Sequence, residues 1–124
     1  MRIAAVVERL NYGTASGSLR RDAWYVSGTY RLGAGSVRAG FARASDGSGP
    51  STETVGFFRS GSHTAARQLT AGYEYELSRR TALQGYVSRL DNDSSAIYDF
   101  AINGVGAQAG QRLTVVALGL RHSF

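Results

Sequence analysis

Strict alternation between apolar and polar residues is the feature that most limits how this chain can fold. The clearest example is residues 68–77, QLTAGYEYEL, where one parity consists of Leu69, Ala71, Tyr73, Tyr75 and Leu77. The other parity holds no large apolar residue and includes two glutamates. A helix would spread those glutamates around its surface, whereas a strand places them on one side. The alternation, repeated in residues 22–32, DAWYVSGTYRL, therefore predicts an all-β protein.

Six strands are predicted from this pattern, at about residues 2–11, 20–32, 36–44, 66–77, 80–90 and 112–124. Tight turns at 33–35 and 78–80 join two pairs of strands, and longer loops rich in Gly, Ser and Asp are expected at 12–21, 45–64 and 91–111. Short connections at one end and long ones at the other are typical of an antiparallel up-and-down meander whose ends face different environments. No linker or shift in composition marks a second domain.

Composition excludes several kinds of site. The chain has 124 residues and no cysteine, which excludes a disulfide scaffold, a thiolate metal site and a cysteine nucleophile. His63 and His122 stand alone, and there is no G-x-S-x-G motif. No catalytic, cofactor-binding or metal-binding residue is predicted, and an enzyme is not expected. The net charge of +5 comes from arginines dispersed along the chain, which argues against a nucleic-acid partner.

Two structures would explain the alternation. A soluble antiparallel sheet would bury one face in a core, whereas a transmembrane barrel would turn its apolar face to lipid and its polar face to a watery lumen. Strands of about ten residues suit a tilted membrane crossing. In the middle of the strands the residues of the apolar parity are too small to fill a dense core: Gly28, Ala39, Ala71 and Gly85. The barrel is favoured further because aromatic residues lie at the ends of the apolar parity, as in membrane-interface girdles; they are Trp24, Tyr30, Phe41, Tyr75 and Phe124.

Three stretches carry a family resemblance: LRRDAWYVSGTYRLGAGSVRAGFARASDG, YEYELSRRTALQGYVSRLDNDSSAIYDFAINGV and VVALGLRHSF. They contain a Y-x-L-S-R-R-T turn, a following strand that ends in DN, and the closing run G-L-R-H-S-F. In these features the chain resembles the trimeric porins of Gram-negative bacteria, of the betaproteobacterial general diffusion type.

The resemblance implies a transmembrane antiparallel barrel of 16 strands, of which residues 1–124 match the last six, as the C-terminal part of a porin β-barrel domain. It also implies an outer-membrane location, a homotrimer, passive diffusion of ions and small hydrophilic solutes through a water-filled pore, and no cofactor. Two alternatives stay open from the residues alone. One is a soluble lipocalin-like ligand-binding module, and the other is a non-conducting structural or adhesion barrel of the outer membrane.

Residues of the polar parity are the candidates for the pore lining. A solvated sheet face is the alternative reading of each. The candidates are Tyr25, Ser27, Thr29, Arg31, Arg38, Gln68, Thr70, Glu74, Glu76, Gln84, Tyr86, Ser88 and Arg121.

Six arginines take the apolar parity at the long-loop ends of the strands: Arg9, Arg20, Arg43, Arg67, Arg89 and Arg112. We expect them to form a girdle whose stems lie on apolar surface while the guanidiniums bind lipopolysaccharide phosphates. Ordinary loop arginines that share a parity by chance are the alternative.

The end of the chain carries a second expected signal. Alternate residues Val116, Leu118, Leu120, His122 and Phe124 form a row in which only His122 is not apolar. The row resembles the signal that the barrel-assembly machinery recognises in outer-membrane proteins. The last strand is expected to pair with the first strand of a closed barrel, which would need no polar tail after it.

Overall fold

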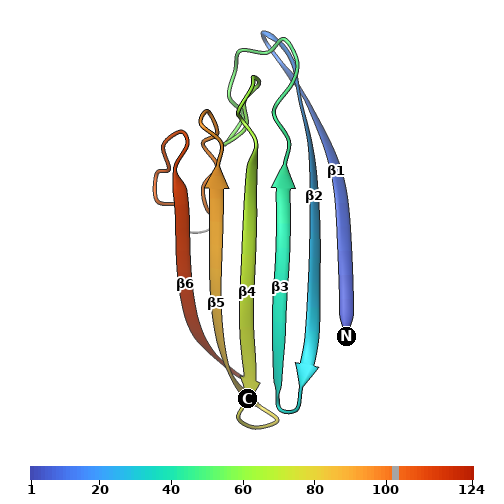
Figure 1. Cartoon of the computed structure of the whole chain (residues 1–124), viewed down its shortest axis with the longest axis vertical. Coiled ribbons are helices and arrows are strands. Elements are labelled where there is room, and N and C mark those ends of the chain that lie inside the picture. The colour runs from blue at the N-terminus through green and yellow to red at the C-terminus, as the bar shows by residue number, and fades with distance from the viewer. Residues whose placement is uncertain (102–103) are drawn as a thin grey trace.

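The computed structural model describes residues 1–101 and 104–124 and shows a single sheet of six strands in sequence order (Figure 1). The strands are β1 (Arg2–Thr14), β2 (Gly17–Leu32), β3 (Gly35–Ala44), β4 (Ala66–Glu76), β5 (Thr81–Asn92) and β6 (Arg112–His122). Each strand pairs antiparallel with its neighbour in the chain. The predicted all-β, up-and-down architecture is therefore confirmed. Among the described residues there is no helix long and apolar enough to cross a membrane.

The first connection differs from its prediction. Residues 12–21 were expected to form a long loop, but β1 and β2 pair out to Thr14 and Gly17, which leaves a two-residue turn. The Thr14 hydroxyl donates to the Gly17 carbonyl at 2.8 Å, and Gly17 has a positive φ of 136°, which glycine adopts without a Cβ clash. Ser51 of the β3–β4 loop lies 2.7 Å from the Thr14 hydroxyl and supports the hairpin tip.

The pairing register gives the sheet two chemically distinct faces. Residues opposite each other on neighbouring strands share a face, so the face of Val26 continues through Phe41, Leu69, Arg89 and Thr114. We call this the apolar face, because most of its large side chains are apolar, and the opposite one the polar face. Val7 on β1 and Leu118 on β6 are 85% and 87% exposed on the apolar face.

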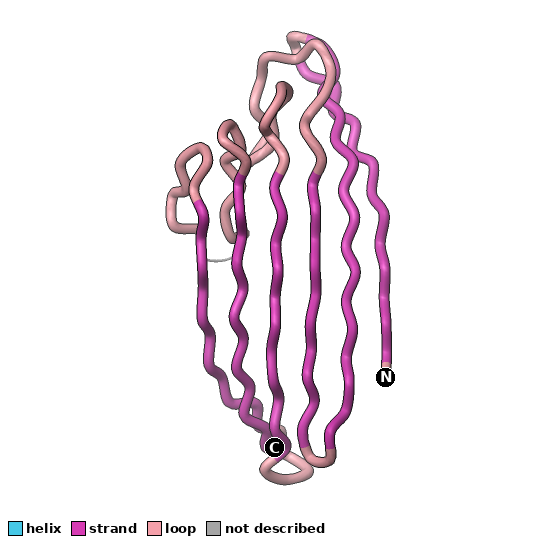
Figure 2. Tube along the Cα trace, in the orientation of Figure 1, coloured by secondary structure: helices cyan, strands magenta, loops and turns pink. Residues whose placement is uncertain are grey.

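Most of the buried core lies at the long-loop end, on the polar side of the sheet, while Ala82 is buried on the same face at the short-turn end. Leu19 and Leu90 of the polar face are 0% and 5% exposed, and Phe58 of the β3–β4 loop is 5% exposed. The two longest loops gather at the same end of the sheet (Figure 2). No buried apolar residue of the six strands lies on the apolar face, and Ala65, just before β4, is buried beside Arg43 and Arg67. The large apolar side chains of that face therefore stay uncovered.

Candidate functional site

The thirteen candidate pore-lining residues all lie on the polar face. The register brings them together from five strands, because positions of one parity on each strand face the same side. They are Tyr25, Ser27, Thr29 and Arg31 of β2, Arg38 of β3, Gln68, Thr70, Glu74 and Glu76 of β4, Gln84, Tyr86 and Ser88 of β5, and Arg121 of β6.

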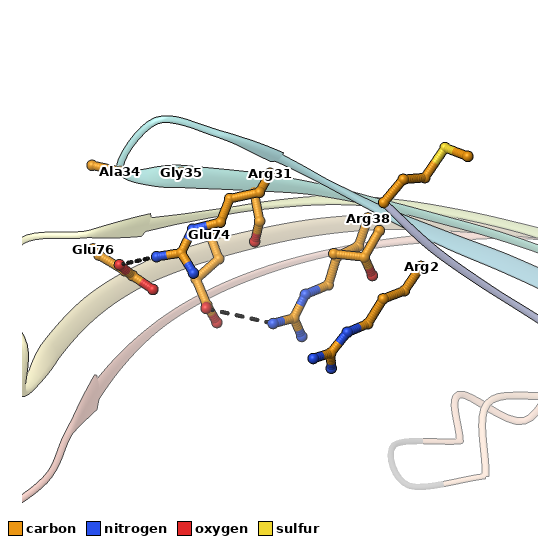
Figure 3. A pocket seen from close by; sticks show the side chains of 10 residues that line it. Arg2, Arg31, Ala34, Gly35, Arg38, Glu74 and Glu76 are labelled. Atoms are coloured by element: carbon orange, nitrogen blue, oxygen red, sulfur yellow. Dashed lines mark hydrogen bonds and ion pairs between the residues drawn. The ribbon is translucent and has the colours of Figure 1, made fainter.

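A network of ion pairs occupies the short-turn end of the polar face (Figure 3). Arg31 and Glu76 are paired at 2.8 Å. Glu74 lies between Arg38 at 3.4 Å and Arg121 at 3.3 Å, and its side chain is only 10% exposed. The three arginine side chains stay half to two-thirds exposed, so the network presents guanidinium groups to solvent around one sheltered carboxylate.

This network borders an open groove of about 560 Å³, which Arg2 of β1 also lines. Over the whole polar face, five arginines stand against three glutamates, an excess of two positive charges: Arg2, Arg21, Arg31, Arg38 and Arg121 against Glu8, Glu74 and Glu76. Sequence reasoning missed Arg2, Glu8 and Arg21. For Arg2 and Glu8, the sequence did not show which residues of the first strand face which side; the pairing with β2 does. Arg21 shares the parity of Tyr25 and could have been identified from the sequence.

Small polar groups fill the middle of the polar face. The Gln68 amide donates to the Ser88 hydroxyl at 2.8 Å, and the Thr70 hydroxyl lies 2.7 Å from the same oxygen. The Tyr86 ring lies against Gly72 of the neighbouring strand, so closely that an added Cβ would overlap it. Hydroxyl, amide and phenol groups with partners on the same face make a surface that water can wet.

Arg21 fastens both long loops to the polar face at the opposite end. Its guanidinium lies 5.2 Å from the Phe58 ring centroid of the β3–β4 loop and 5.5 Å from that of Tyr98 in the β5–β6 loop. It also donates to the Tyr98 hydroxyl at 2.9 Å and pairs with Glu8 at 3.5 Å. A cation between two aromatic faces is held by ring quadrupoles as well as by the hydrogen bond, so one side chain joins strands and loops.

Asp99 organises the β5–β6 loop. Its carboxylate accepts backbone hydrogen bonds from Ala107 at 3.0 Å, Val105 at 2.9 Å, Phe100 at 2.7 Å and Gly106 at 2.8 Å. These N–H groups, that of Ala107 foremost, hold the pKa of Asp99 below its usual value, because they favour the charged form.

All six candidate girdle arginines lie on the apolar face at its long-loop end: Arg9, Arg20, Arg43, Arg67, Arg89 and Arg112. Two acidic residues that were not among the candidate site residues share this face. Asp22 pairs with Arg9 at 2.7 Å, and Asp91 pairs with Arg67, Arg89 and Arg112. The parity of Asp22 and Asp91 was visible in the sequence, whereas their arginine partners depend on the register.

The last strand exposes its apolar row. Val116, Leu118 and Leu120 are 68%, 87% and 63% exposed on the apolar face, and Phe124 is fully exposed. His122 is accommodated there because its Nδ1 lies 2.8 Å from the Thr81 hydroxyl and its ring packs edge-on to Phe124 at 4.9 Å.

Known proteins with similar sequence or structure point to one family. The pattern that defines the Gram-negative porin family matches residues 1–95. Outer membrane porin protein 32 of Delftia acidovorans is 42% identical over 62 residues, which are 48% of this chain and 18% of that protein. The anion-selective porin from Comamonas acidovorans has a similar structure, with a TM-score of 0.76 and 24% identity.

The structural match covers 98% of this chain and 34% of the solved porin, so the chain spans about a third of that protein's length. At 24% identity the likeness shows the fold, a stretch of porin barrel. The family match extends over most of the chain and agrees with the up-and-down sheet. This chain therefore belongs to the Gram-negative porin family and is an outer-membrane protein.

Proposed function

We propose that this chain forms part of the wall of a porin barrel, through which ions and small hydrophilic solutes diffuse passively. The observation that carries the proposal is the separation of the two faces. The apolar face exposes large side chains such as Val7, Leu69 and Leu118, an area that soluble proteins do not leave uncovered. If the apolar face contacts lipid, its exposed side chains are removed from water, and the polar face then borders a watery lumen.

The sheet edges support a role as part of a larger barrel. The outer edges of β1 and β6 have no partner strand among the described residues, and lipid cannot satisfy unpaired backbone groups. We propose that both edges pair with further strands of one barrel, with residues 1–124 as the C-terminal part of the domain, and that three barrels assemble into a homotrimer. The resemblance to trimeric porins supports the trimer.

The charge on the polar face favours anions. Five arginines and three glutamates leave two positive charges on the proposed lumen wall, and such an excess raises the local concentration of anions. The solved porin of similar structure is described as anion-selective, which agrees with this preference.

Two further partners are proposed from the apolar face. The arginine girdle would contact lipopolysaccharide phosphates, since the long loops of outer-membrane barrels are extracellular. The exposed row from Val116 to Phe124 would be read by the barrel-assembly machinery during insertion. Its exposure, at 63% to 107% for the four apolar residues, supports recognition by another protein.

Conductance tests the proposed function. The porin that carries this chain, refolded and added to a planar lipid bilayer, should give stepwise ohmic currents in KCl with a preference for chloride. A barrel that inserts into the bilayer and gives no current would refute the channel and favour a structural role. Solubility of the folded protein without detergent would refute the membrane placement itself.

A further inference from the structure

We propose that Arg43 and Arg67 hold the phosphate of a single membrane lipid, whose acyl chains lie along the Trp24–Phe41 surface beside them. The site is on the apolar face at the long-loop end, on strands β2, β3 and β4. The inference rests on the proposed function in one respect, the exposure of this face to lipid. It narrows the six-arginine girdle to one place with a defined ligand chemistry.

The first observation is an opposed pair of like charges. Arg43 and Arg67 are direct partners in the β3–β4 register. Two cations at opposed positions destabilise a sheet, and an anion bound between them would reverse that effect. A phosphate oxygen pair also matches the planar fork of a guanidinium, which can bind it in bidentate fashion.

The second observation is that the acidic partners on this face are taken elsewhere. Asp22 pairs with Arg9 at 2.7 Å, and Asp91 is shared among three arginines, with Arg67 the most distant at 3.4 Å. Across residues 1–101 and 104–124, no acidic side chain forms an ion pair with Arg43. The pair therefore keeps a positive charge that an external anion can neutralise.

The third observation is a hollow between the two side chains. Arg43 and Arg67 line a space of about 130 Å³ together with Ala65, Ala66 and Asp93. The alanines are small and leave the guanidiniums accessible. Asp93 is the one acidic residue that lines this space. Four arginines lie nearby against two aspartates, Asp91 and Asp93, so two positive charges remain. The arginines are Arg43, Arg67, Arg89 and Arg112.

The fourth observation identifies the ligand as a lipid rather than free phosphate. Trp24 is the β2 partner of Arg43, and its ring lies 5.2 Å from that of Phe41, two residues further toward the short turns. A second groove, of about 400 Å³, runs across the strands from Arg43 past Trp24 to Val7, and Glu8, Arg9, Asp22 and Ser45 also line it. On the short-turn side of the two arginines, Phe41 and its β4 partner Leu69 continue the apolar surface from Trp24. Acyl chains can pack on that surface, whereas inorganic phosphate gains nothing from it.

Native mass spectrometry of the intact porin, folded in a neutral detergent, tests the site with defined probes. They are bisphosphorylated lipid A, the same lipid without phosphates, and inorganic phosphate. The unaltered protein should retain one lipid A molecule at this site. Arg43→Gln and Arg67→Gln should each weaken retention about tenfold or more, because each removes charge-assisted hydrogen bonds. Arg79→Gln, the same charge change in the β4–β5 turn, should leave retention unchanged.

Thermal unfolding provides a second readout that does not depend on retention. Without lipid, Arg43→Gln should unfold at the same or a higher temperature, because an opposed like-charge pair is removed. With lipid A, the unaltered protein should gain stability through ligand linkage, and Arg43→Gln should gain less. Equal lipid A retention by Arg43→Gln and the unaltered protein would overturn the proposal, as would equal retention of the phosphate-free lipid. Inorganic phosphate that competes as tightly as lipid A would overturn the lipid assignment.

Conductance separates this inference from the proposed function. Arg43→Gln should conduct as the unaltered porin does, because the side chain lies on the face opposite the proposed lumen. If the unaltered protein binds lipid A but carries no current, the proposed function fails and the lipid site stands. If it conducts but Arg43→Gln retains lipid A unchanged, only the lipid site fails.

Discussion

Replacing Glu74 with glutamine probes the charge of the proposed lumen wall. Glu74 is the sheltered carboxylate between Arg38 at 3.4 Å and Arg121 at 3.3 Å. Glutamine has nearly the same shape and keeps an acceptor oxygen, but Glu74→Gln raises the excess charge of the polar face from two to three. Anions should then pass more readily, and cations less readily.

The size of the effect follows from Coulomb's law. One unit charge acting in water on an ion about 10 Å away changes its energy by about 0.4 kcal/mol, which is roughly a factor of two in local concentration. Because anions gain and cations lose, the anion-to-cation permeability ratio should rise about fourfold where screening is weak. At 1 M salt, where the Debye length is about 3 Å, the change should nearly vanish.

Reversal potentials across a planar bilayer measure this ratio. With dilute KCl, about 0.01 M on the weaker side so that the Debye length is about 30 Å, Glu74→Gln should shift the potential toward that of chloride. Asp22→Asn is the matched control, since it removes the same charge from the apolar face. A Glu74→Gln variant without a shift, or an equal shift in Asp22→Asn, would refute the assignment of the polar face to the lumen.

Three further outcomes are expected. Arg21→Ala should release both long loops and cost about 2 kcal/mol of local stability, seen as faster amide exchange in residues 45–65 and 93–101, whereas Arg20→Ala, on the other face, should not. Acid should loosen the β5–β6 loop, because the pKa of Asp99 is lower in the folded loop than in the open chain. The stability that Asp99 gives the loop is therefore complete above about pH 4, the usual pKa, and is lost as pH falls through the folded pKa. Amide exchange at residues 105–107 measures this, and Asp99→Asn should abolish the pH dependence. Gly72→Val should displace the Tyr86 ring and lower the free energy of unfolding in detergent by about 1–3 kcal/mol; unchanged stability would contradict the close packing.

Sequence alone predicted most of the sheet, because its signal is local. Alternation over about ten residues located all six strands within a few residues of their observed bounds, and parity placed each candidate on a face. The β1–β2 tip was missed because Thr14 to Ser18 is small and polar and carries no alternation. Its pairing depends on a turn at Gly17 and on Ser51, which is distant in sequence.

Contacts between segments that are distant in sequence could not be predicted, because the sequence signal is local. Parity shows that Asp91 shares a face with several arginines, but only the register shows that Arg67 and Arg112 are its direct partners on β4 and β6. The position of Arg21 between Phe58 and Tyr98 depends on how two long loops fold back over the polar face. No periodic pattern encodes the path of such loops.

Cysteine accessibility along β4 tests the central claim, that one face of this sheet meets lipid and the other meets water. The chain has no cysteine, so single substitutions at Gln68, Leu69, Thr70 and Ala71 report each position separately. In the porin reconstituted into liposomes, a charged, membrane-impermeant thiol reagent should modify cysteine at 68 and 70 quickly, and at 69 and 71 slowly or not at all. Uniform reactivity along the strand, or fast modification at 69 and 71 instead, would contradict the two-faced barrel wall.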